Sequence, residues 1–225
     1  MRLLFDQRAE ELKEKIHHVG RESYFVNDNA ALDDTRQEAV QELARRMVDP
    51  PGTLRVLMHS LAFGALKPLA GAEEVINRHQ LELTADVMGH SLVYWVQACL
   101  KAGLMDRGAR IFAMISIGGS RAVPNYGPVS AAKATLEAHI RQLAVELAPA
   151  GITANAILVG VTDTNALRQI PGYEKIMEVA RQRNPNRRLT QPEDVARCIA
   201  ALCHPATYWL TGNTLHVDGG ENIVG

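Results

Sequence analysis

The chain has 225 residues and a formal net charge of −1, so it lacks the basic footprint of a protein that binds nucleic acid or an anionic membrane surface. Its apolar content of 47% is that of a globular protein that can bury a core. We therefore expect a single domain over residues 1–225, with neither nucleic acid nor membrane as a partner.

The cysteines and the start of the chain indicate a compartment. Cys99, Cys198 and Cys203 lie in apolar helical patterns, without the spacing of a disulfide framework. The first residues, 1–6, become charged too soon for a signal peptide. The eight histidines show no metal-ligand spacing with cysteines or carboxylates, so we expect no metal site. These features favour a cytoplasmic protein.

Short apolar runs alternate with amphipathic segments along the chain. The expected strands are residues 2–5, 23–26, 54–58, 111–115, 153–158 and 210–217. The expected helices are residues 6–18, a segment capped by Asp33 or Asp34, residues 72–80, 84–101, 132–147, 173–183 and 192–202. Strands that alternate with helices predict parallel β-α-β units with right-handed crossovers. The fold class is therefore α/β, with a doubly wound parallel sheet.

Polar or glycine-rich segments follow four of these strands. They are residues 27–30, 59–64, 116–120 and 159–164. Ligands of parallel sheets bind at the carboxyl ends of the strands, so we expect these segments to outline one crevice.

The segment Tyr126-Gly-Pro-Val-Ser-Ala-Ala-Lys133 opens the helix that follows the strand at 111–115. Seven residues are close to two helical turns, so the two side chains share one face, roughly 10 Å apart along the axis. An ammonium ion near a phenol favours the phenolate, which makes a device that donates a proton or stabilises an oxyanion. On spacing alone, Tyr126 is equally well a residue at a helix start and Lys133 a solvated helix residue.

Several motifs together resemble one family over nearly the whole chain. They are the Tyr-x6-Lys spacing, His59-Ser-Leu-Ala-Phe63, Arg121-Ala-Val-Pro-Asn-Tyr126, Asn155-Ala-Ile with Gly160-x-x-x-Thr164, and Thr211-Gly with Val217-Asp-Gly-Gly220. Their order and spacing resemble the short-chain dehydrogenase/reductase family, and within it the bacterial enoyl-[acyl-carrier-protein] reductases. The resemblance implies a Rossmann-type fold and reduction of the trans-2 double bond of enoyl thioesters by NADH or NADPH in fatty-acid synthesis.

The resemblance also implies a role for individual residues. Tyr126 would hydrogen-bond the enolate oxygen, and Lys133 would hold the hydroxyls of the nicotinamide ribose. The further cofactor-binding residues implied are Asn29, Ser60, Leu61, Ala62, Thr162 and Thr164, and the candidates for the substrate pocket are Phe63 and Ser116. Asn29 and Ser60 are also consistent with ordinary turn residues that bond their own backbone.

One expected motif is missing from the start of the sequence. Neither Gly-x-x-x-Gly-x-Gly nor Gly-x-Gly-x-x-Gly occurs before Gly20, so we expect the first strand and the Gly-rich loop that cradles a pyrophosphate to be missing. A truncated record, another segment in that place, and a relative that binds no dinucleotide would each explain this. We favour truncation.

The resemblance implies partners and leaves alternatives. An acyl carrier protein would present the substrate, and the arginines at 181, 183, 187 and 188 would meet its acidic surface, unless they only line a solvated loop. We expect a homodimer or homotetramer, in which the helices at 132–147 and 91–101 form either an interface or intrachain core. The alternative functions are a carbonyl or 3-oxoacyl reductase and a non-catalytic structural subunit.

Overall fold

The computed structural model describes residues 29–48 and 52–224. The chain forms two compact units, which we describe separately. One contains α2 (Asn29–Arg46) and residues 95–104, and the other contains residues 54–94 and those from 105 on. The elements expected at residues 2–5, 6–18 and 23–26 lie outside the described residues. The single domain stays a prediction.

A parallel sheet forms the centre of the second unit. Its strands are β1 (Val56–His59), β2 (Arg110–Ser116), β3 (Thr153–Val159) and β4 (Thr214–Val217), in the order β1-β2-β3-β4. The expected α/β class with a parallel sheet is confirmed. The last strand is shorter than expected, because Gly212 has a φ of 75° and breaks the extended backbone before Thr214.

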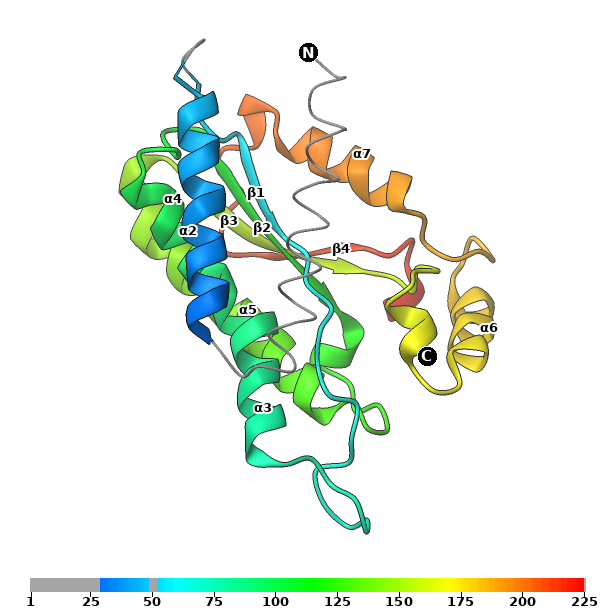
Figure 1. Cartoon of the computed structure of the whole chain (residues 1–225). Coiled ribbons are helices and arrows are strands. Elements are labelled where there is room, and N and C mark those ends of the chain that lie inside the picture. Colours follow the sequence, from blue (N-terminus) through cyan, green and yellow to red (C-terminus); the bar gives the residue numbers. More distant parts are fainter. Residues whose placement is uncertain (1–28, 49–51, 225) are drawn as a thin grey trace. The chain divides into compact units, whose positions relative to one another are not determined.

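Helices pack on both faces of this sheet. On one face, Phe112 of β2 and Ile157 of β3 pack against Val195 of α7 (Pro192–Leu202). The other face is covered by α5 (Gly127–Leu147), as Figure 1 shows. Side chains alternate between the faces of a strand, so both strands are apolar throughout, as in a sheet that is covered on both sides.

The apolar stripe of α5 belongs to the core of the chain itself. Ala132, Leu136 and Ile140 are at most 1% exposed. This stripe, which the sequence left open as an oligomer interface, is therefore intrachain core. The helix has Pro128 in its first turn, where a missing N–H costs nothing, and it is followed by Gly151 with a φ of 73°.

A helical segment precedes β2 and contains a π-helical turn. It consists of α3 (Arg78–Ala85), the π-helical residues Asp86–His90 and α4 (Ser91–Lys101). The helix expected at 72–80 begins only at Arg78, because Asn77 and Gln80 form a capping box: each side chain accepts a hydrogen bond from the other residue's backbone N–H. The boundary between the two units falls within α4.

The other helices follow the apolar pattern with one correction. α6 (Tyr173–Arg183) and α7 have the expected bounds. In α2, Ala39 and Val40 are buried as expected. However, α2 begins at Asn29, so Asp33 and Asp34 lie inside the helix and the prediction that they cap it is wrong. The sequence Ala-Ala-Leu before them favours helix, so helical backbone extends toward the amino terminus.

No helix within residues 29–48 or 52–224 is long and apolar enough to cross a membrane. Cys99, Cys198 and Cys203 are all free thiols, and burial raises the pKa of Cys99 to about 11.

Asn155 ties β3 to the turn before β4, and its removal should destabilise the fold. The side chain is 2% exposed, donates from Nδ2 to the Leu210 carbonyl at 2.9 Å and accepts from the Asn213 N–H at 3.1 Å. We expect Asn155→Ala to lower the free energy of unfolding by about 2 kcal/mol, because buried polar groups lose their partners. Urea unfolding measures this.

Gln142→Ala is the matched control, because Gln142 is exposed and bonds only Glu146 on the same helix. It should change the free energy of unfolding by less than about 0.5 kcal/mol. An Asn155→Ala protein as stable as this control would contradict the structural role of Asn155.

Candidate active site

The candidate site lies where three strands of the second unit end. β1 ends at His59, β2 at Ser116 and β3 at Val159, and the register sets Ser116 directly beside Val159. Three of the four expected polar strand exits therefore share one edge of the sheet, as predicted. Of the fourth, residues 27 and 28 lie outside the described residues, and Asn29 and Ala30 belong to α2 in the other unit.

Tyr126 stands at the start of α5 and reaches toward the end of β2. Its backbone N–H donates to the Val123 carbonyl at 3.1 Å, and it is the residue immediately before the helix. A Cβ added to Gly118 would lie 2.5 Å from Cε1 of the Tyr126 ring, so the ring occupies the space that a side chain at 118 would fill. The phenolic Oη lies 3.5 Å from Ser116 Oγ. Tyr126 and Ser116, which the sequence placed in different roles, are thus direct neighbours.

Lys133 lies two turns further along α5, and its ammonium is buried at the same edge of the sheet. The residue is 7% exposed, and Nζ donates to the Met114 carbonyl at 2.8 Å and to the Leu61 carbonyl at 3.2 Å. Burial lowers its pKa to about 8. The alternative of a solvated helix lysine is wrong, because the side chain crosses from α5 to the ends of β1 and β2.

His59 was not among the predicted site residues, although it ends β1 and is 5% exposed. Its Nε2 lies 2.8 Å from Ser91 Oγ, and that hydroxyl donates its own hydrogen to the Val87 carbonyl at 2.6 Å. The Ser91 oxygen must therefore accept, which puts the proton of the neutral ring on Nε2. Nδ1 is buried without a hydrogen-bond partner among the described residues.

Burial and then the positive charge of Lys133 lower the pKa of His59 to about 4. The ring is therefore neutral at neutral pH, and the only positive charge of this pair is on Lys133. The position of His59 directly after an apolar strand was the one signal in the sequence that could have identified it.

The exit of β3 carries Thr162 and Thr164, whose hydroxyls are engaged locally. Thr162 Oγ1 donates to the Gly160 carbonyl at 3.1 Å, and Thr164 Oγ1 accepts from the Leu167 N–H at 3.1 Å. These bonds shape the loop, and Thr162 is half-buried while Thr164 is exposed. The sequence placed both residues correctly in a strand exit but gave no sign of these bonds.

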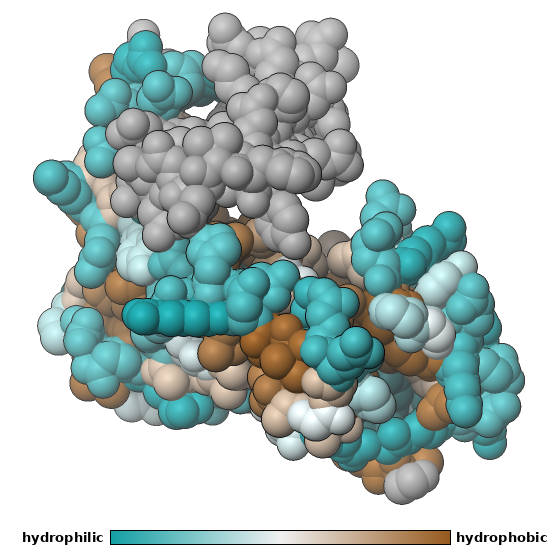
Figure 2. Space-filling view, turned by 60° about the horizontal axis from the view of Figure 1, so that its bottom comes forward, coloured by the Kyte–Doolittle hydropathy of each residue, from teal (hydrophilic) through white to brown (hydrophobic). Residues whose placement is uncertain are grey.

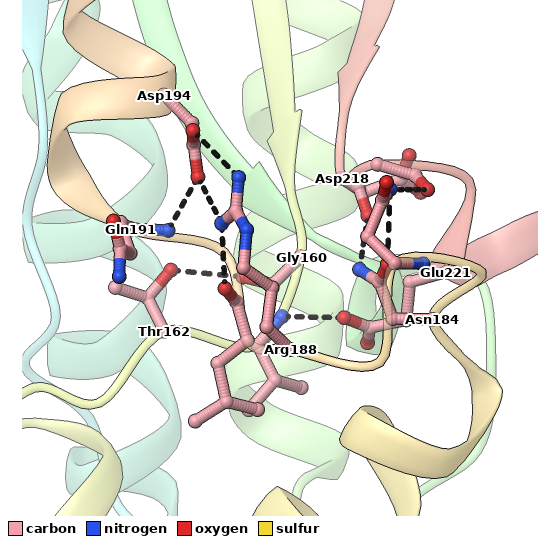
Figure 3. A network of polar contacts seen from close by, with 12 residues as sticks. Gly160, Thr162, Asn184, Arg188, Gln191, Asp194, Asp218 and Glu221 are labelled. Atoms are coloured by element: carbon pink, nitrogen blue, oxygen red, sulfur yellow. Dashed lines mark hydrogen bonds and ion pairs between the residues drawn. The ribbon is translucent and has the colours of Figure 1, made fainter.

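A second polar network holds this exit from the opposite side (Figure 3). Glu221 Oε2 accepts from the Val161 N–H at 3.1 Å, and Asn184 Nδ2 donates to the Asp218 carbonyl at 3.0 Å. Asn184, Asp218 and Glu221 are all buried. Burial raises the pKa of Glu221, and its bond to Val161 partly offsets this effect. None of the three was predicted as a site residue.

The exit of β1 holds the remaining predicted residues. Ser60 and Ala62 are exposed, while Leu61 and Phe63 are half-buried. Of these, Leu61 is tied to the site by its carbonyl, which accepts from Lys133. Asn29 is the first residue of α2, in the other unit, so its role stays a prediction.

Apolar side chains border Tyr126. The ring packs with Leu66 against a buried cluster of Met88, Val129 and Ala132. In Figure 2, brown apolar side chains gather within a polar surround on the face of the molecule that is turned to the viewer. An apolar chain next to a hydroxyl donor suits a substrate with a long hydrocarbon part.

Metal chemistry finds no support in the described ranges. Within residues 29–48 and 52–224, no three or more His, Cys, Asp or Glu side chains come together in a way that could hold a metal ion.

Comparison with known proteins gives a consistent result. A family model described as "Enoyl-(Acyl carrier protein) reductase" matches residues 2–222. The NADH enoyl-[acyl-carrier-protein] reductase of Bacillus subtilis (strain 168) is 29% identical over 224 residues, which are 99% of this chain and 86% of that protein. The corresponding protein of Nostoc sp. (strain PCC 7120) is 33% identical over 221 residues, 98% of this chain and 82% of its own length.

Solved structures agree with the sequence matches. The enoyl-acyl carrier protein reductase of Bacillus cereus, in complex with NADP+ and indole naphthyridinone, superimposes with a TM-score of 0.77 and 28% identity. The match covers 86% of this chain and 73% of that one.

His59 should make the protein sensitive to acid. Its pKa of about 4 lies below the ordinary value of 6.5, so the unfolded chain binds the proton first as the pH falls. The contribution of His59 to stability is therefore complete above pH 6.5 and is lost as the pH falls toward 4. Between pH 7 and pH 5 we expect wild type to lose about 2 kcal/mol more unfolding free energy than His59→Gln.

Urea unfolding at several pH values measures this difference. His79→Gln is the matched control, because His79 is exposed on α3, and it should follow the wild-type curve. Identical pH dependence in wild type and His59→Gln would show that His59 is not held neutral.

Proposed function

Since this chain belongs to the enoyl-(acyl carrier protein) reductase family, we propose that it reduces the trans-2 double bond of enoyl thioesters, carried by acyl carrier protein, in fatty-acid synthesis. It is thus an NADH- or NADPH-dependent oxidoreductase. The observation that carries this proposal is the meeting of Tyr126 Oη, Ser116 Oγ and Lys133 Nζ around the carboxyl end of β2.

The described residues fit the nicotinamide-ribose half of a dinucleotide. An ammonium group has three N–H donors, and Lys133 uses two of them on the carbonyls of Leu61 and Met114. The third remains for the hydroxyls of a ribose at the crevice. Further residues that we propose to hold the dinucleotide are Ser60, Leu61, Ala62, Thr162, Thr164 and Asn29. When bound, NADH or NADPH supplies the hydride that reaches the β-carbon of the enoyl group.

Tyr126 acts on the thioester oxygen. As the double bond is reduced, negative charge develops on that oxygen, and the Tyr126 hydroxyl donates a hydrogen bond to it. The ring is held by Gly118 on one side and by the apolar cluster with Leu66 on the other, so the donor is oriented before the substrate arrives. The charge of Lys133 and the neutrality of His59 keep the local potential positive, which favours the enolate.

Ser116 and Phe63 are proposed to line the substrate pocket. Ser116 Oγ lies 3.5 Å from Tyr126 Oη and can take part in the same hydrogen-bond chain. Phe63 follows the β1 exit and is half-buried.

We propose that the arginines at the end of α6 receive the acidic carrier. Arg187 is exposed, whereas Arg188 forms a two-bond ion pair with Asp194 at 2.6 and 2.9 Å. Arg183 donates to the Val224 carbonyl at 2.6 Å. Arg187 is therefore the arginine whose charge can be changed with little effect on the fold. A cytoplasmic location and a homodimer or homotetramer complete the proposal.

Tyr126→Phe should slow the reaction strongly. We expect kcat with NADH or NADPH and a crotonyl thioester to fall about 10²- to 10⁴-fold, because the variant lacks the hydrogen-bond donor for the thioester oxygen. Oxidation of the nicotinamide, followed by absorbance, measures the rate. Dinucleotide affinity should be nearly unchanged in calorimetry.

A variant that keeps most of the wild-type kcat would rule out this role of Tyr126. Wild-type protein that binds neither NADH nor NADPH in calorimetry would instead favour a non-catalytic family member.

Arg187→Glu should affect only the carrier-bound substrate. We expect KM to rise several-fold for an enoyl group on acyl carrier protein and to stay unchanged for the CoA thioester, because only the carrier presents an acidic surface. Arg107→Glu carries the same charge change next to β2, at the amino-terminal edge of the sheet, and should leave both values unchanged. Equal effects of Arg187→Glu on the two substrates would contradict carrier docking.

A further inference from the structure

The loop at residues 160–164 is held by a carboxylate from the end of the chain. Glu221 begins the short helical turn Glu221–Ile223 and is 6% exposed. Its Oε2 accepts from the Val161 N–H at 3.1 Å. No other buried carboxylate within the described residues bonds directly to a strand exit of the candidate site.

The path of the loop is fixed on both sides of Val161. Its N–H bonds Glu221, and its carbonyl accepts from the Thr190 N–H at 3.1 Å. A Cβ on Gly160 would lie 2.4 Å from Thr190 Oγ1 and 2.9 Å from Glu221 Oε2. The backbone of the loop therefore lies as close to these two side chains as a glycine allows.

Thr162 follows directly, and its hydroxyl donates to the Gly160 carbonyl. A shift of the Val161 peptide would therefore move Thr162 with it, because the two peptides are adjacent. The carboxylate is itself supported: Asp218 and Asn184 anchor the turn that carries it, through the Gly220 N–H and the Asp218 carbonyl. Figure 3 shows these contacts meeting around Gly160.

We propose that Glu221 is a positioning residue, which holds the 160–164 loop in the form that receives the nicotinamide end of the dinucleotide. This proposal rests on the proposed function. Glu221 acts through the Val161 peptide and not by contact with substrate, so its loss should weaken dinucleotide binding more than binding of the enoyl thioester.

Two variants separate the hydrogen bond from the charge. Glu221→Leu cannot accept from the Val161 N–H, whereas Glu221→Gln keeps an amide oxygen that can. In the protein without dinucleotide, hydrogen exchange of the Val161 amide should be at least about tenfold faster in Glu221→Leu and near wild type in Glu221→Gln. With dinucleotide, Glu221→Leu should raise the KM for NADH or NADPH by about tenfold and leave the KM for crotonyl thioester within about twofold.

A double-mutant cycle tests the pair directly. Val161→Pro removes the same N–H from the other side. If the hydrogen bond is the shared element, the Glu221→Leu/Val161→Pro double variant should raise the dinucleotide KM no more than the larger single effect. Effects that multiply would overturn the proposal.

Asn155→Ala controls for general destabilisation, because it weakens the same sheet at its other end. It should lower the melting temperature without raising the dinucleotide KM. Unchanged Val161 exchange in Glu221→Leu, or equal KM values in Glu221→Leu and Glu221→Gln, would overturn the proposal. If wild-type protein neither binds nor oxidises NADH or NADPH, the proposed function fails, and the exchange experiment still decides whether Glu221 holds the loop.

Discussion

The candidate site depends on one buried charge. The Lys133 ammonium lies out of solvent, where an unpaired cation would cost several kcal/mol, and the Leu61 and Met114 carbonyls offset that cost. Both acceptors are backbone atoms, so the lysine joins α5 to β2 and to the exit of β1 without a carboxylate. Since no anion neutralises it, the charge remains available to a bound oxygen.

This charge explains its surroundings. A second cation beside it would be repelled, and His59 is accordingly held neutral with its proton on Nε2. The helix must also approach β2 closely for the ammonium to reach the Met114 carbonyl. Gly119 permits this, because a Cβ there would lie 3.2 Å from Lys133 Cβ. Ser91, the partner of His59, belongs to the site for the same reason as Gly119: each allows the cation to sit where it does.

The sequence predicted the part of this arrangement that periodicity and motif spacing encode. The strands at 54–58, 111–115 and 153–158 lie within one or two residues of β1, β2 and β3, and their parallel order follows from the helices between them. Tyr126 and Lys133 were predicted to share a helix face, and both reach the end of β2.

The contacts that cross the chain could not be predicted in this way. Glu221 lies 60 residues from its partner Val161 in sequence, so no local pattern relates the two. His59 reads as the end of an apolar strand, and only the fold shows that Ser91 stands opposite its ring. The start of α3 was missed for a local reason: the capping box of Asn77 and Gln80 outweighs the helix-forming residues before it.

The π-helical turn Asp86–His90 gives the chain an unusual sensitivity to its length. Such a turn amounts to one residue inserted into an α-helix, and each residue advances an α-helix by about 100°. Thr84 and Met88 are buried before or within the turn, and Ser91 is buried directly after it, so the added residue sets the phase of everything that follows. A one-codon deletion within these five positions would keep the composition downstream, yet would rotate Ser91 away from His59. Reading frame along this helix is therefore under tighter constraint than residue type.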